Sequence, residues 1–104
     1  MLLSTTYTIH DKKIVKHLGL VRGNTVRARH IGRDIMAGLR NMVGGEITDY
    51  TKMMAESREQ AIDRMIEDAQ KLGANAIIGV RFSTTETMQR AAEIMAYGTA
   101  VVVE

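Results

Sequence analysis

The sequence predicts an α+β fold in which an antiparallel sheet carries one short helix and one long helix. Two observations lead to this prediction. Segments rich in alternating or β-branched residues stand near both ends of the 104-residue chain, which is typical of strands. Between them, Ile31–Gly45 and Asp49–Leu72 place apolar side chains at helical spacing. Because no linker divides so short a chain, we expect a single domain over residues 1–104.

Three strands are predicted before the first helix. Ser4–His10 and Ile14–Arg22 are rich in residues that favour strands, and Thr25–His30 alternates apolar and polar side chains. Gly23-Asn24 lies between the last two segments and is a common reverse-turn pair. We therefore expect these segments to form an antiparallel hairpin.

The short helix, Ile31–Gly45, ends in two glycines. Gly44-Gly45 is interpreted as a helix stop rather than a phosphate loop, because no Gly-Lys-Ser/Thr sequence follows it. Arg33 and Arg40 are seven residues apart and share one edge of this helix, while Asp34 lies on the far side.

The long helix is predicted to begin at Thr48 or Asp49, either of which can cap it, and to end before Gly73. Its apolar face is interrupted by Arg58, which falls near the centre of the apolar arc. Because a buried unpaired charge is costly, Arg58 either extends to the surface or is paired under cover.

The last part of the chain predicts two more strands. Ala74–Phe82 is an apolar run whose central Gly79 suggests a bulge or a close backbone approach. Ser83–Glu93 is polar and is expected to be a loop or strand tip, and Ile94–Val103 is the final strand.

The composition excludes several kinds of protein. The chain has no cysteine, so it has no disulfides, no thiolate nucleophile and no Cys-based metal site. Its N-terminus does not have the pattern of a signal peptide, and no apolar run is long enough to span a bilayer. We therefore expect a cytoplasmic protein with no membrane partner. A chain of this size buries only about two thirds of its unfolded surface, which favours self-association.

Several motifs resemble the YbjQ-like family, small bacterial proteins that carry a heavy-metal-binding label. The matching segments run in order over nearly the whole chain: Ser4–Thr6 (STT), Arg33–Gly45 (RDIMAGLRNMVGG), Tyr50 at the start of the long helix, Arg58–Ala61, Leu72–Val80 (LGANAIIGV) and Gly98–Val101 (GTAV). The resemblance implies antiparallel strands with one long helix, in a dodecin-like arrangement. It also implies assembly into a ring, a homopentamer. It brings no established reaction.

The metal label finds little support in the residues. His10, His17 and His30 lack the spacing of a helical ligand pair. The methionines on the helices fall on apolar faces, where flexible core filling is their ordinary role. We therefore predict no metal site, although metal binding remains an alternative, and the sequence does not indicate a cofactor.

No catalytic residues are predicted either. None of the serines lies in a Gly-x-Ser-x-Gly context, and no pair of acidic residues is marked for acid–base chemistry. Nucleic acid is not an expected partner, because the basic stretch from Arg22 to Arg33 is not accompanied by stacking aromatics or a helix-turn-helix signature. We expect a non-enzymatic protein, with an enzyme site completed between subunits as the alternative.

Charge is divided unevenly along the chain. Residues 1–45 carry eight Lys or Arg and two Asp, whereas residues 46–104 carry six basic and ten acidic residues. The predicted site comprises Arg33, Asp34, Arg40 and Arg58. These residues form either a salt-bridge network where subunits meet or a binding site for a small anionic ligand, and the sequence leaves both interpretations open.

Overall fold

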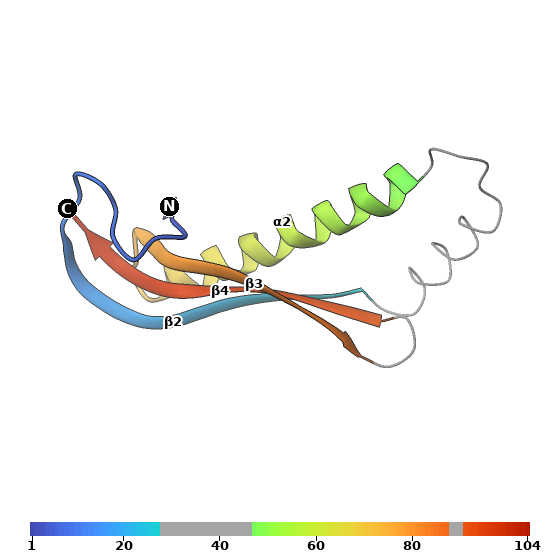
Figure 1. Ribbon diagram of the computed structural model, residues 1–104. Helices are drawn as coiled ribbons and strands as arrows, with labels where there is room; N and C mark the ends of the chain where they lie inside the picture. The colour runs from blue at the N-terminus through green and yellow to red at the C-terminus, as the bar shows by residue number, and fades with distance from the viewer. Residues whose placement is uncertain (28–46, 88–90) are drawn as a thin grey trace.

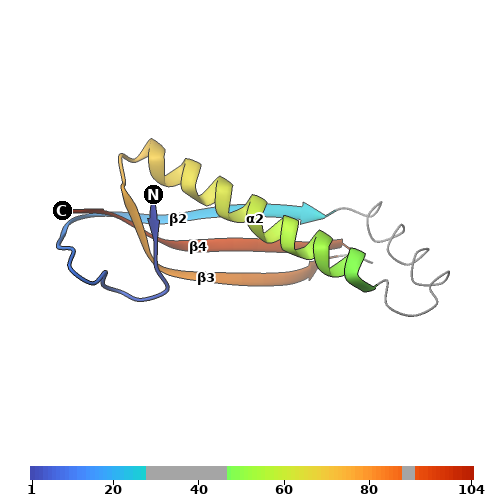
Figure 2. The same cartoon turned by 90° about the horizontal axis from the view of Figure 1, so that it is seen from above.

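The computed structural model describes residues 1–27, 47–87 and 91–104. The predicted short helix at Ile31–Gly45 lies outside these residues, and so do Arg33, Asp34 and Arg40. The described elements are β1 (Leu2–Leu3), β2 (Ile14–Arg27), α2 (Ile47–Lys71), β3 (Ala76–Thr87) and β4 (Ala91–Val103). The fold is α+β, with α2 crossing one face of the sheet (Figure 1, Figure 2).

The sheet is mixed rather than antiparallel. Its strand order is β1-β3-β4-β2, and β4 lies antiparallel to both of its neighbours. β1 instead runs parallel to β3, with Leu2 opposite Ala76 and Leu3 opposite Ile77. The prediction of an antiparallel sheet was therefore right for the three long strands and wrong for the short N-terminal one.

The predicted hairpin around Gly23-Asn24 is wrong, because β2 runs through this pair without turning. The reason is the position of α2. A Cβ atom on Gly23 would collide with the backbone oxygen of Ala61 and the backbone nitrogen of Met65. The glycine thus lets the helix backbone approach the strand, which a local turn signal cannot reveal.

The predicted strand Ser4–His10 is also not formed. Only Leu2–Leu3 is a strand, and the following residues bend along the start of β3. Backbone hydrogen bonds still attach this segment: the Ser4 amide donates to the Ile77 oxygen at 2.9 Å, and the Gly79 amide donates to the Thr6 oxygen at 2.9 Å. The N-terminal segment is therefore fixed to the sheet by its backbone.

The later elements confirm their predictions closely. α2 ends at Lys71, and Gly73 has a φ of 85°. Gly79 has a φ of 62° and lies in a break of register between Ile78 and Arg81, which is the expected bulge. The polar segment Ser83–Glu93, expected to be a loop or strand tip, is instead largely strand, because β3 extends to Thr87 and β4 begins at Ala91.

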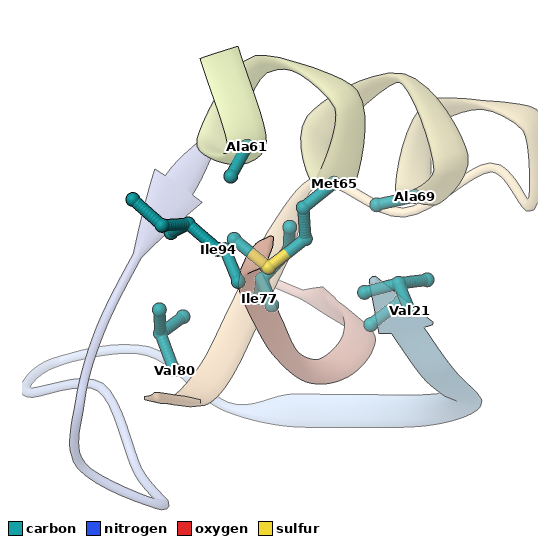
Figure 3. Packing of buried hydrophobic residues seen from close by; sticks show 9 residues of the cluster. Val21, Ala61, Met65, Ala69, Ile77, Val80 and Ile94 are labelled. Carbon is teal, nitrogen blue, oxygen red and sulfur yellow. The ribbon is translucent and has the colours of Figure 1, made fainter. Parts of the chain in front are cut away.

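The main core lies between α2 and the sheet. The buried helix positions recur every four residues, and Figure 3 shows Met65 pointing from α2 toward Ile77 on β3. The members of this cluster are Val21, Ala61, Met65, Ala69, Ile77, Val80, Ile94, Ala96 and Ala100. Ser57 is buried one turn before Ala61, whereas its neighbour Arg58 is exposed. The residues by which α2 contacts the sheet are thus shifted around the helix from the predicted apolar face. Arg58 was predicted near the centre of that face and is exposed in the single chain.

A smaller buried cluster lies on the other face of the sheet, at one end only. It contains Ala76, Ile78, Val101 and Val103, with Ile9 and Ile14 packed against it. The N-terminal segment supplies part of this cover. Among the described residues, no helix is long and apolar enough to cross a membrane.

Candidate anion-binding row on the open sheet face

One face of the sheet carries α2, and the register of the strands identifies the side chains on the opposite face. Ile94, Ala96 and Ala100 of β4 pack with the helix. Because side chains alternate along a strand, Tyr97 of β4 points away from α2. Arg22 lies between the helix-facing Val21 and Gly23 and also belongs to this opposite face. We call the face of the sheet opposite α2 the open sheet face.

Two arginines flank Tyr97 on this face. Arg22 of β2 is the direct cross-strand partner of Tyr97 on one side, and Arg81 of β3 is its partner on the other. The guanidinium of Arg81 also lies over the ring of Tyr7, 5.7 Å from its centroid. Four side chains from four segments therefore alternate across the sheet. We call them the Arg–Tyr row: Arg22, Tyr97, Arg81 and Tyr7.

The guanidinium of Arg81 is held at a defined place. Its Nη1 atom donates to the backbone oxygens of Thr5 at 2.7 Å and Val80 at 2.8 Å. The ring of Tyr7 lies over the bulge, since a Cβ atom added to Gly79 would lie 2.9 Å from it. The N-terminal segment thus orients one of the two cations of the row.

Neither arginine of the row is neutralised by a carboxylate in the described part of the chain. The one ion pair found among residues 1–27, 47–87 and 91–104 joins His10 and Asp11. Glu93 shares the open sheet face, but it accepts a hydrogen bond from Asn24 Nδ2 at 2.8 Å. Two guanidinium groups without an acidic partner favour binding of an anion.

Side chains of α2 hold the part of β2 that bears Arg22. Asp68 Oδ2 accepts a hydrogen bond from the Arg22 amide at 3.3 Å, and Arg64 Nη1 donates to the Asn24 oxygen. These two residues are one helical turn apart, so their side chains can bond successive outward-facing backbone groups of β2, which a neighbouring strand would otherwise bond. The helix therefore occupies two backbone hydrogen-bonding groups on the outer edge of β2, next to the end of the row that Arg22 forms.

Among the described residues, the side chains that could bind a metal do not gather in one place. No group of three His, Asp or Glu side chains gathers within these ranges. His10 and Asp11 lie 3.4 Å apart, but their side chains are 95% and 85% exposed. Met65 is buried in the core, as expected for a packing residue. His30 lies outside the described residues.

The predicted site and the Arg–Tyr row consist of different residues. Arg33, Asp34 and Arg40 lie outside the described residues, and Arg58 is exposed on α2. Sequence reasoning noted Arg22 as part of a basic stretch but did not select Arg81 or the tyrosines. The only signal available was an arginine or a tyrosine in each of four predicted strands, and none of these segments alone reveals the register that aligns them.

Comparisons with known proteins agree with the family resemblance. The family model described as "Putative heavy-metal-binding" matches residues 1–104. A UPF0145 protein from Dehalococcoides mccartyi is 61% identical over 104 residues, covering 100% of both chains. One from Methanosarcina acetivorans is 58% identical over 101 residues, covering 97% of this chain and 95% of that protein.

A solved structure supports the fold. The crystal structure of a DUF74-family protein with unknown function from Pediococcus pentosaceus matches with a TM-score of 0.65 and 18% identity. The match covers 100% of this chain and 98% of that one. At this identity the likeness concerns the fold alone.

Proposed function

The chain belongs to the YbjQ-like family, which includes the UPF0145 proteins, and we propose that it is a self-assembling, non-enzymatic module that binds a small anion where subunits meet. The observation that supports this proposal is a pair of guanidinium groups on the open sheet face, Arg22 and Arg81, for which the described residues supply no carboxylate partner. Guanidinium groups bind oxyanions through paired hydrogen bonds and stay protonated at neutral pH, so they are poor acid–base catalysts. The chemistry of the row therefore favours binding over catalysis.

The shape of the chain supports self-assembly. The radius of gyration is 16.8 Å, and the extents are 54 × 26 × 16 Å. A compact domain of this length has a radius of gyration of about 13 Å. Large apolar side chains are left exposed on this extended body, with Leu20 at 69% and Phe82 at 46%. A second copy that covers the open sheet face would bury Leu20 and place the Arg–Tyr row in an interface.

The form of the assembly follows from the family resemblance. We propose a dodecin-like ring of five subunits, as that resemblance implies. The predicted polar set Arg33, Asp34, Arg40 and Arg58 is retained as a second candidate contact between subunits. Light scattering on the purified protein should give a mass several times the 11.5 kDa of one chain. A monomer at every concentration tested would refute the assembly.

Anion binding is tested separately, by calorimetric titration with inorganic phosphate and pyrophosphate. Arg22→Gln should weaken binding several-fold, because it removes one uncompensated cation from the row. Lys71→Gln is the matched control, since Lys71 is an exposed cation in the last turn of α2. Equal weakening by both variants would indicate a general charge effect and would argue against a site at the row.

A further inference from the structure

The alternation of arginine and tyrosine narrows the kind of anion that fits the open sheet face. We infer that the Arg–Tyr row binds an anion with a flat aromatic ring, so that the ring lies against Tyr97 and the oxyanion meets Arg22. This inference rests on the proposed function, because it names the ligand class of the same site. The shared chemistry is an aromatic ring joined to a carboxylate or a phosphate.

The spacing of the row disfavours a small oxyanion as its full occupant. Adjacent strands lie about 4.8 Å apart, so Arg22 and Arg81 start about 10 Å from one another across Tyr97. The guanidinium of Arg81 is also held by Thr5 and Val80 on the side of β3 that carries the N-terminal segment. A ligand longer than a single phosphate group can lie across Tyr97 and reach Arg22 while Arg81 keeps its backbone partners.

The surroundings of Tyr97 are suited to a ring. Leu20 lies two residues before Arg22 on the same face of β2 and is 69% exposed. Met95 lies two residues before Tyr97 on β4 and is half-buried. A phenol ring, a leucine and a thioether offer aromatic, apolar and sulfur contacts, all of which an aromatic ring uses and a hydrated phosphate does not.

The other end of the row already contains a contact with an aromatic ring. The guanidinium of Arg81 lies over the ring of Tyr7 at 5.7 Å from the centroid. Arg22 is the other cation of the row, and among the described residues no ring contact of this kind is found for it. A bound aromatic anion would give Arg22 a counter-charge, while its ring lies against the neighbouring Tyr97.

Matched ligands test this inference on the intact protein. Benzoate and cyclohexanecarboxylate carry the same charge on six-membered carbon rings, and AMP and ribose 5-phosphate differ by the base. We expect the aromatic member of at least one pair to bind about fivefold more tightly, since aromatic contacts contribute about 0.5–1.5 kcal/mol. The pair that shows the preference identifies the carboxylate or the phosphate as the source of the charge.

Two further measurements locate the ring. Tyr97→Leu should remove the difference in affinity between the two members of each matched pair, whereas Arg22→Gln should weaken the binding of both members and keep their ratio. If Tyr97→Leu does not fold, the wild-type protein still answers the question, because a ring on Tyr97 must shift the methyl resonances of Leu20 and Met95. Absence of these shifts during saturation with the aromatic ligand would overturn the inference.

The outcomes separate this inference from the proposed function. Phosphate binding with equal affinity within each matched pair would refute the aromatic class and leave the anion-binding module standing. Failure of phosphate, pyrophosphate and all four matched ligands to bind would refute both.

Discussion

The guanidinium of Arg81 lies over the ring of Tyr7, 5.7 Å from its centroid, and thereby joins β3 to the N-terminal segment. The two residues are 74 positions apart in the numbering and meet because the segment follows β3 past the bulge at Gly79. Arg81 also bonds the Thr5 oxygen, so ring and backbone hold the same side chain. The contact thus links the N-terminus to the Arg–Tyr row.

Replacement of Tyr7 tests this link. Tyr7→Leu should lower the free energy of unfolding by about 0.5–1 kcal/mol, because Tyr7 is exposed and cation–π contacts at exposed sites have this size. Urea denaturation measures the change. Tyr7→Phe is the control, since it keeps the ring and removes the hydroxyl, and it should be close to wild type. If both variants lose the same stability, the phenolic hydroxyl and not the ring is responsible.

The close approach of α2 to β2 at Gly23 predicts a large effect from one methyl group. Gly23→Ala should destabilise the fold by at least about 1–3 kcal/mol, because the added Cβ meets helix backbone that cannot rotate away. Thermal unfolding measures the loss. Ala61→Gly in the same chain should not restore stability, since the obstructing atom of Ala61 is its backbone oxygen. Rescue by Ala61→Gly would show that the side chain of Ala61 causes the collision.

The hydrogen bond from the Arg22 amide to Asp68 predicts a local exchange rate. Asp68→Ala should accelerate hydrogen exchange at the Arg22 amide by roughly fivefold, because a net hydrogen bond contributes about 1 kcal/mol. Amide exchange followed by NMR gives the rate for each residue. Glu67→Ala is the control, as Glu67 is exposed and adjacent on α2. An unchanged rate at Arg22 with Asp68→Ala would mean that another group protects this edge of β2.

Features set by neighbouring residues were predicted correctly, whereas a feature set by residues far along the chain was not. Gly73 ends α2 and Gly79 forms a bulge, and both effects arise within a few residues of chain. Gly23 was wrongly assigned to a turn. A glycine is needed at this position because the backbone of Ala61 and Met65, about 40 residues later, passes close to it. Local signals therefore predicted where elements end. They did not predict that β2 continues through Gly23.

The candidate site depends even more on residues that are far apart in the sequence. Arg22, Arg81 and Tyr97 belong to three strands, and a shift of register by one residue would place any of them on the helix side. Alternation within one strand can assign a face but cannot align three strands. The predicted polar set was selected from helical spacing instead, and of its members the described residues include Arg58 alone.

Arg58 offers a test of the contact between subunits that the sequence predicts. Its side chain is exposed in the single chain, so Arg58→Met should keep the fold and change the free energy of unfolding by less than about 0.5 kcal/mol. If Arg58 pairs with a neighbouring subunit, the same variant should lower the mass found by light scattering, because the partner's charge loses its counter-ion. We expect a folded protein with weakened assembly.

The control for this variant is Lys52→Met, which removes another exposed cation of α2. It should leave both the fold and the mass unchanged. Circular dichroism and light scattering on the same samples separate the two effects. A folded Arg58→Met variant with the wild-type mass would exclude Arg58 from the interface. An unfolded variant would show instead that its charge supports the subunit itself, contrary to the exposure of its side chain.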